Sequence, residues 1–83
     1  MSKVTVYGAN WCEDTEATLK DLDSFSVPYD YVDVDQDPAA QDWVKGQNGG
    51  RQRTPTLDID GQILVEPDRR DLEQALRGKG LLG

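Results

Sequence analysis

Apolar positions in the first part of the chain alternate between strand-like runs and a segment with helical spacing. Residues 3–7 are β-branched and aromatic and predict a buried strand. Residues 12–23 predict a helix that Val27-Pro28 should break, and residues 29–34 predict a second strand. The apolar stripe of this helix consists of Thr15, Thr18, Leu19 and Leu22. The pattern therefore predicts a strand, a helix and a strand in succession.

The rest of the chain carries start and stop signals. The pair Asp37-Pro38 suits a helix N-cap followed by the first helical residue, and Asn48-Gly49-Gly50 suits the end of that helix. We expect four residues on its inner face, namely Ala40, Trp43, Val44 and Gln47. Asp60-Gly61 is a two-residue hairpin signal between strands at residues 56–59 and 62–65.

A final helix is predicted to begin near Asp68 and to end at Gly78-Lys79-Gly80, which completes the order βαβαββα. The first βαβ unit requires two parallel strands, because a crossover helix returns the chain in the same direction. The hairpin adds an antiparallel pair of strands. We therefore predict an α/β fold with a four-stranded mixed sheet and helices on both faces, in a single domain that spans residues 1–83.

Composition narrows the classes of function. The chain has 16 acidic and 9 basic residues, a net charge of −7, which argues against binding to a nucleic-acid backbone. No apolar run is long enough to cross a membrane, and residues 1–3 lead into a strand without a signal-peptide core. One cysteine cannot form an internal disulfide, so we expect a cytoplasmic location. We also expect a monomer.

The absence of histidine excludes several kinds of site. Without histidine the chain cannot carry cysteine–histidine or serine–histidine–aspartate catalysis, or the common histidine-based metal sites. The acids in residues 33–37 resemble the start of a calcium loop, but Pro38 and Val44 occupy positions that need glycine and glutamate. A solvated strand end and a helix cap explain these acids, and we expect no metal.

The only cysteine lies where a thiolate would be favoured. Cys12 follows the break Gly8-Ala9-Asn10 and opens the first helix, where free backbone N–H groups and the helix dipole favour an anion. The thiolate is the nucleophilic form of cysteine, and thiol exchange needs no histidine base. Glu13 and Asp14 oppose the dipole, so we expect a thiol pKa only mildly below the ordinary value of about 8.5. The alternative is a small buried apolar residue.

The order of elements and five motifs resemble the glutaredoxin branch of the thioredoxin fold, and the resemblance covers essentially the whole chain. The motifs are Trp11-Cys12-Glu13-Asp14-Thr15, Asn48-Gly49-Gly50, Thr54-Pro55-Thr56, Asp60-Gly61 and Glu66-Pro67-Asp68. The chain is similar to bacterial glutaredoxin-like and mycoredoxin-like proteins, which share an Asn-Gly-Gly loop before the Thr-Pro turn. The resemblance implies thiol–disulfide exchange, commonly the reduction of mixed disulfides between proteins and glutathione or a similar small thiol.

The resemblance also implies roles for single residues. Cys12 would be the nucleophile, and Pro55 would be a cis-proline that faces it. The backbone of Thr54 would pair with the small thiol, and Asp68 with its helix N-terminus would meet the other end of the substrate. Trp11 would flank the cleft. The small thiol is then a co-substrate rather than a bound cofactor, and disulfide-bearing proteins are the partners.

The chain departs from the family pattern at two positions. Thr15 stands where dithiol members carry a second cysteine, so a second small-thiol molecule would have to complete a monothiol reaction. The Thr15 hydroxyl could donate a hydrogen bond to the thiolate, although filling a cysteine-sized space is the simpler interpretation. Ala9 replaces a lysine that many members place three residues before the nucleophile.

Residues 43–57 contain no acid and carry a net charge of +3 from Lys45, Arg51 and Arg53. Because this strip leads into Thr54-Pro55, Arg51 or Arg53 could bind the carboxylate of an anionic thiol. The alternative is a solvated loop with incidental charge. We therefore predict a thiol–disulfide oxidoreductase with one catalytic cysteine. The alternatives are a non-catalytic thioredoxin-fold module that binds peptides beside Trp11, and an enzyme recycled by a flavin reductase.

Overall fold

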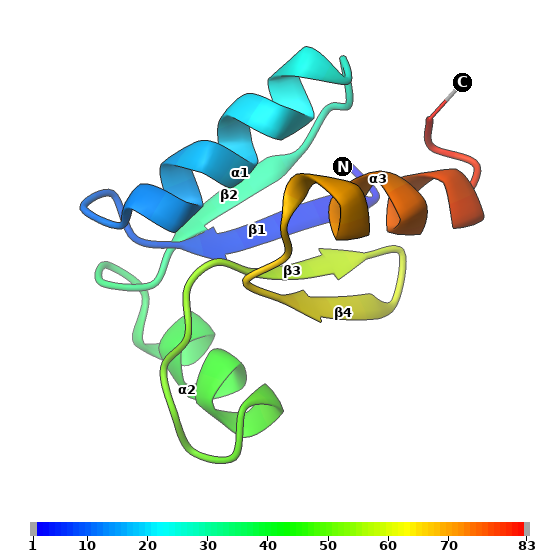
Figure 1. The fold of residues 1–83 in the computed structure, drawn as a ribbon. Coiled ribbons are helices and arrows are strands. Elements are labelled where there is room, and N and C mark those ends of the chain that lie inside the picture. Colours follow the sequence, from blue (N-terminus) through cyan, green and yellow to red (C-terminus); the bar gives the residue numbers. More distant parts are fainter. Residues whose placement is uncertain (1, 83) are drawn as a thin grey trace.

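The computed structural model describes residues 2–82. Its elements are β1 (Val4–Gly8), α1 (Glu13–Ser24), β2 (Asp30–Asp33), α2 (Pro38–Gln47), β3 (Thr56–Ile59), β4 (Gln62–Val65) and α3 (Arg69–Gly78). The predicted order βαβαββα is confirmed (Figure 1). The predicted domain limits at residues 1 and 83 lie outside the described residues. Within residues 2–82, no helix has the length and apolar character that a membrane span requires.

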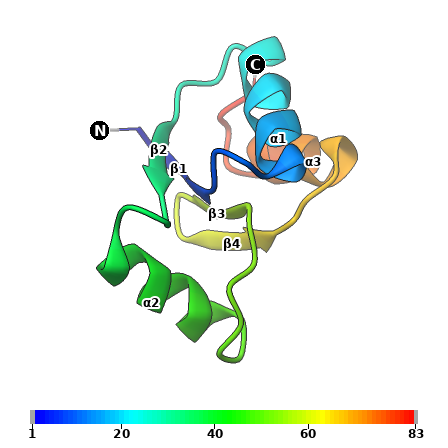
Figure 2. The ribbon, with the colours of Figure 1, turned by 90° about the vertical axis from the view of Figure 1, so that its left-hand side faces the viewer.

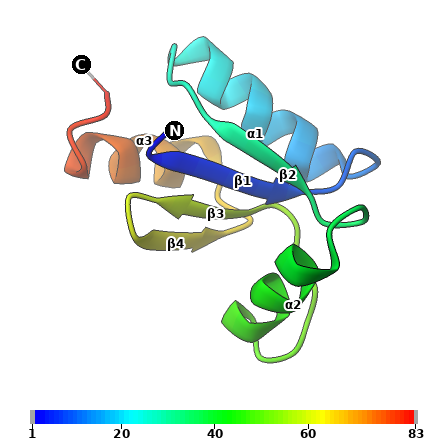
Figure 3. The ribbon, with the colours of Figure 1, turned by 180° about the vertical axis from the view of Figure 1, so that it is seen from behind.

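The four strands form one mixed sheet in the order β2-β1-β3-β4. β1 runs parallel to β2 and antiparallel to β3, so that Val6 is in register with Tyr31 on one side and with Leu57 on the other. β3 and β4 form the antiparallel hairpin that Asp60-Gly61 predicted. The strands are seen from behind in Figure 3. The crossover through α1 makes the first pair parallel, as expected from a βαβ unit.

Helices cover both faces of the sheet, as predicted. α1 and α3 lie on one face and α2 lies on the other (Figures 1 and 2). The larger core is built from Val4, Val6, Leu22, Val27, Leu57, Ile59, Leu72, Ala75 and Leu76. The smaller core under α2 consists of Val34, Ala40 and Val44 with Tyr7, Val32 and Trp43 packed against it. Alternation along β1 divides its side chains between the two cores, because successive residues of a strand point to opposite faces.

The first helix agrees with the prediction of residues 12–23 to within one residue at each end. α1 begins at Glu13 with Cys12 as its N-cap, and it ends at Ser24. Ser26 takes a left-handed conformation with φ 57°. Its N–H donates to the Asp23 carbonyl, and the Val27 N–H donates to the Leu22 carbonyl at 3.1 Å. This is a Schellman ending with serine where glycine is usual, and no glycine signalled it in the sequence.

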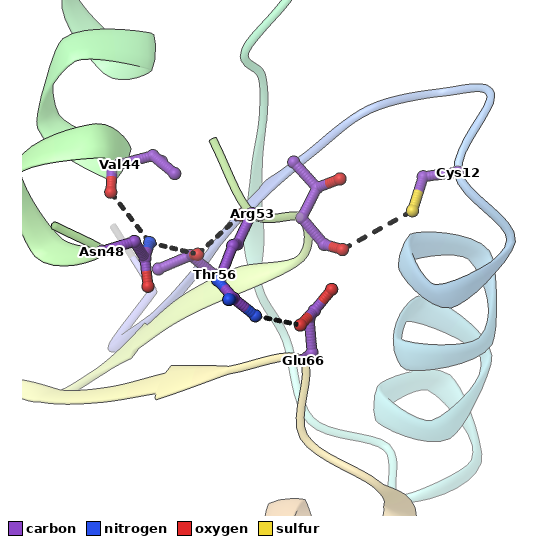
Figure 4. Close-up of polar contacts among 7 residues, drawn as sticks. Cys12, Val44, Asn48, Arg53, Thr56 and Glu66 are labelled. Carbon is purple, nitrogen blue, oxygen red and sulfur yellow. Dashed lines mark hydrogen bonds and ion pairs between the residues drawn. The ribbon is translucent and has the colours of Figure 1, made fainter. Parts of the chain in front are cut away.

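The second strand and the second helix differ from the prediction in detail. β2 spans Asp30–Asp33, one residue shorter at each end than the predicted residues 29–34. Gln47 is exposed rather than on the inner face of α2. Asn48 takes the inward position, since its side-chain Nδ2 donates to the Val44 carbonyl at 2.8 Å and to the Thr56 hydroxyl at 3.4 Å (Figure 4). Asn48 therefore ties the end of α2 to the segment that follows Pro55.

Candidate active site

Cys12 sits at the N-terminus of α1, at one end of the sheet. Its backbone is extended, with φ −86° and ψ 120°, and its side chain is half-buried rather than sealed in apolar packing. The Cys12 N–H donates to the Ala9 carbonyl at 3.0 Å, and the Cys12 carbonyl accepts from the Glu16 N–H at 3.1 Å. These two bonds close the loop after β1 into a turn that leads directly into the helix. The sulfur therefore lies beside the free N–H groups of the first helical turn.

The turn before β3 faces the sulfur. The Thr54–Pro55 peptide bond is cis. The Cys12 thiol donates to the Thr54 carbonyl oxygen with 3.6 Å between sulfur and oxygen (Figure 4). Pro55 is fully buried, and Thr54 is 8% exposed. Within residues 2–82 the Thr54 N–H donates to no acceptor, so one backbone donor beside the sulfur has no partner in this part of the chain.

Hydrogen bonds set the acidity of the cysteine. Burial acts to raise the pKa of the Cys12 thiol, but donors from Thr54, Thr15 and Asp14 outweigh it and lower the pKa below its ordinary value. The Thr54 carbonyl accepts from the thiol and so favours the protonated form, whereas the Thr54 hydroxyl favours the thiolate, and the net direction is downward. The predicted direction agrees, but the exposed carboxylates of Glu13 and Asp14 are not among the causes.

Thr15 is a buried residue of α1, three positions after Cys12. Its side chain is 2% exposed, so it fills a buried space between α1 and the sheet. Its hydroxyl accepts from the Ala9 N–H at 3.4 Å and also lowers the pKa of Cys12. Gly8 explains the close approach, because a Cβ on Gly8 would collide with the Thr15 methyl group and would lie 3.0 Å from the Tyr31 ring.

The two predicted arginines differ in their surroundings. Arg53 Nη1 forms an ion pair with Glu66 Oε2 at 3.3 Å (Figure 4). The Glu66 N–H donates to the Pro55 carbonyl at 2.8 Å, so this pair lies at the edge of the cis-proline turn. Arg51 is exposed and forms no ion pair within residues 2–82. The structure therefore brings Arg53 to the turn but already pairs it with an acid.

Glu66 belongs to the predicted motif Glu66-Pro67-Asp68 but had no predicted role of its own. A signal was available in the hairpin, because Val65 pairs with Thr56 and the next residue along β4 must then lie opposite Pro55. Extending the predicted hairpin register by one residue would have identified Glu66 as a neighbour of the turn.

Asp68 is the N-cap of α3, where its side chain accepts from the Asp71 N–H at 2.8 Å. It lines a cavity of about 270 Å³ between α1 and the start of α3, together with Asp14 and Glu66. The predicted substrate contact at Asp68 therefore shares a hollow with the helix that carries Cys12. A larger cavity of about 350 Å³ lies between β4 and α3 and is lined by none of the predicted site residues.

Trp11 lies on the surface next to Cys12, and its side chain is 71% exposed. Its indole Nε1 donates to Asp35 Oδ2 at 2.7 Å, and the neighbouring Asn10 accepts from the Tyr31 hydroxyl at 2.8 Å. The sequence indicated only a solvated strand end at residues 33–37 and did not predict that Asp35 would accept a hydrogen bond from Trp11. In residues 2–82, no group of three histidine, cysteine, aspartate or glutamate side chains lies close enough to bind a metal ion.

Comparison with known proteins identifies the family. The family model for glutaredoxin matches residues 4–64. The chain is 46% identical to Mycoredoxin 1 of Corynebacterium glutamicum over 68 residues, which cover 81% of this chain and 84% of that protein. A crystal structure of a mutant thioredoxin-like protein aligns with TM-score 0.81 and 28% identity, covering 93% of this chain and 97% of that one.

A buckwheat glutaredoxin–glutathione complex has the same fold, with TM-score 0.77 at 18% identity over 99% of this chain and 83% of that one. The sheet order and the helices on both faces agree with these matches. The chain therefore belongs to the glutaredoxin family, whose members are thiol–disulfide oxidoreductases.

Proposed function

We propose that this single-domain chain reduces mixed disulfides by a monothiol mechanism with Cys12 as the nucleophile. The Cys12 thiolate attacks the small-thiol sulfur of a disulfide between a protein and a small thiol. A bond forms between Cys12 and the small thiol, the bond to the protein breaks, and the protein thiolate leaves and takes up a proton. A second small thiol, as its thiolate, then attacks the adduct and releases Cys12 as a thiolate. The disulfide is thereby transferred from the client to a pair of small thiols.

The observation that supports this proposal most is the environment of the sulfur. Cys12 is half-buried at a helix N-terminus, lies 3.6 Å from the Thr54 carbonyl, and has a lowered thiol pKa. A lowered pKa increases the thiolate fraction near neutral pH. The sequence contains no second cysteine, so the adduct on Cys12 cannot be resolved within the chain.

The surroundings of Cys12 suggest how the small thiol would bind. The Thr54 N–H next to Pro55, which has no acceptor within residues 2–82, supports backbone pairing with the thiol. Arg53, with Arg51 nearby in sequence, would hold its carboxylate, and Asp68 would meet its other end across the shared cavity. The name of Mycoredoxin 1 and the glutathione in the buckwheat structure support a small thiol as co-substrate. We propose glutathione or a related small thiol, disulfide-bearing proteins as clients, and a cytoplasmic monomer.

The test is turnover of a glutathionylated peptide with glutathione as the second thiol. The unmodified chain should release the free peptide, and Cys12→Ser should abolish release while leaving the fold intact by circular dichroism. Mass spectrometry of the oxidised chain should find one small thiol on Cys12, and its mass identifies the thiol. If the peptide binds but neither chain turns it over, the non-catalytic module is correct and the monothiol enzyme is wrong.

A second variant tests the carboxylate contact. The double variant Arg51→Gln, Arg53→Gln should raise KM for glutathione, because it removes the two arginines proposed to bind the glutathione carboxylate. Arg53 is the one that an ion pair places at the edge of the cis-proline turn. Arg77→Gln is the matched control, since Arg77 pairs with Glu73 on the last turns of α3. An unchanged KM in the double variant would remove both arginines from the site.

A further inference from the structure

Trp11 is a large aromatic side chain that the fold leaves in water. It is 71% exposed and belongs to neither core cluster, whereas Trp43 packs against Tyr7 in the smaller core. A single exposed apolar residue needs no special explanation. Trp11 differs because it precedes Cys12 directly and because its indole forms a hydrogen bond with a carboxylate.

Asp35 holds the ring. The indole N–H is a donor only, and it meets a carboxylate oxygen of Asp35 at 2.7 Å, the length of a charge-assisted hydrogen bond. Asp35 is itself fixed, because its N–H donates to Asp33 Oδ1 at 3.0 Å. The neighbouring Val34 is fully buried, and its N–H donates to the Gly8 carbonyl at 2.9 Å. The acceptor is therefore anchored to the end of the sheet.

From these contacts we infer that Asp35 is a positioning residue, which fixes the Trp11 indole as a contact surface for the protein half of the mixed disulfide. The inference rests on the proposed function. The protein half is the occupant because the two sides of the sulfur differ. On one side, the Thr54 backbone and Arg53 suit a small anionic thiol. On the other, Asp35 follows β2, which lies on the opposite side of β1 from β3, and the ring bonded to Asp35 offers apolar area that a polypeptide chain can cover.

Fixing the ring before binding has a measurable consequence. Ordering a side chain rich in rotamers on binding weakens association, and a ring that is already ordered avoids this loss. Removing the acceptor should therefore raise KM for a peptide substrate by about 3- to 10-fold, with kcat unchanged. A substrate without a peptide chain does not cover the ring, so its KM should stay constant.

The experiment compares two mixed disulfides, glutathione joined to a cysteine-containing peptide and glutathione joined to 2-mercaptoethanol. Asp35→Ala should raise KM for the peptide substrate only, and Asp35→Asn should restore it because the amide oxygen still accepts from the indole. Trp11→Phe keeps a ring but has no N–H, so it should resemble Asp35→Ala, and the double variant should be no worse than either single one. Gln36→Ala is the matched control, because its exposed side chain makes no hydrogen bond within residues 2–82.

Three results would overturn the inference: equal changes in KM for both substrates, no change for the peptide, or additive effects in the double variant. A direct reading of ring motion comes from fluorescence anisotropy in a Trp43→Phe background, where Trp11 is the only emitting tryptophan. Anisotropy should fall in Asp35→Ala and recover in Asp35→Asn. If the unmodified chain turns over neither substrate, the proposed function fails instead, and the two failures are thereby distinguished.

Discussion

Gly8 is the point where β1, α1 and β2 come closest, and adding one methyl group there should disturb both stability and site. In Gly8→Ala the new Cβ would collide with the Thr15 methyl group and would lie 3.0 Å from both the Thr15 hydroxyl and the Tyr31 ring. Thr15 is 2% exposed and cannot rotate into solvent. The N-terminal turn of α1 must therefore move away from the sheet.

Overpacking of this kind costs about 1–3 kcal/mol. In a domain of this size 1 kcal/mol shifts Tm by roughly 4–8 °C, so Tm should fall by at least about 4 °C. Urea unfolding followed by circular dichroism measures the change, and the midpoint should fall with an unchanged m-value. The shift of α1 also moves Cys12 away from the Thr54 donor on the turn before β3, so the thiol pKa should rise in the same variant.

Two further variants test whether the contact with Thr15 causes the loss of stability. Thr15→Ser removes the colliding methyl group and keeps the hydroxyl, so it should recover part of the loss when combined with Gly8→Ala. Gly46→Ala is the matched control, because a Cβ on Gly46 meets nothing within 4 Å, and in a helix it should stabilise the fold by about 0.4–1 kcal/mol. A Gly8→Ala chain within about 0.5 kcal/mol of the original, or fully additive losses with Thr15→Ser, would show that the packing argument is wrong.

Three more predictions concern single contacts. In the unmodified chain, iodoacetamide alkylation should have its midpoint at a lower pH than for an ordinary cysteine, because the thiolate of Cys12 persists to lower pH. Thr15→Val removes a donor that lowers the pKa of Cys12, so this midpoint should rise. Glu66→Gln frees Arg53 from an exposed ion pair and should lower KM for an anionic thiol by about 1.5- to 5-fold in steady-state assays, whereas an increase would contradict this. Arg69→Ala removes hydrogen bonds of 2.9 Å to the Asp21 carboxylate and the Ser24 hydroxyl, and it removes a cation–π contact with Phe25. The free energy of unfolding in urea should fall by about 1–2 kcal/mol, and an unchanged midpoint would show that these contacts do not stabilise the fold.

Much of the fold was predictable because its signals are local. The cap and proline at Asp37-Pro38 fixed the start of α2, and Asp60-Gly61 fixed the hairpin. The end of α1 was predicted to within one residue, but the left-handed conformation of Ser26 that follows it was not, because no glycine signals it. The inward position of Gln47 was wrongly predicted, because Gln47 is the last residue of α2 and the C-cap residue Asn48 turns inward instead.

The candidate site was predictable in its parts but not in its pairings. Helical spacing and the break after β1 put Cys12 at a helix N-terminus, and the same local pattern gave the right direction for its pKa. The Thr15 hydroxyl was considered as a donor, but the hydrogen bond from Thr54 was not, because it depends on how the turn before β3 meets α1. Charge counting along the sequence cannot supply this, since solvent screens the exposed Glu13 and Asp14 while the close donors act at short range.

The sequence alone determined the order of elements, the mixed sheet and the position of the sulfur, because periodicity, caps and turns act over a few residues. Only the tertiary structure decided which side chains meet: Cys12 with Thr54 across 42 residues, Trp11 with Asp35 across 24, and Arg53 with Glu66 across 13. Such pairs form when strand register and helix packing bring separate loops to the same end of the sheet. The sequence pattern of a single segment therefore cannot predict these contacts.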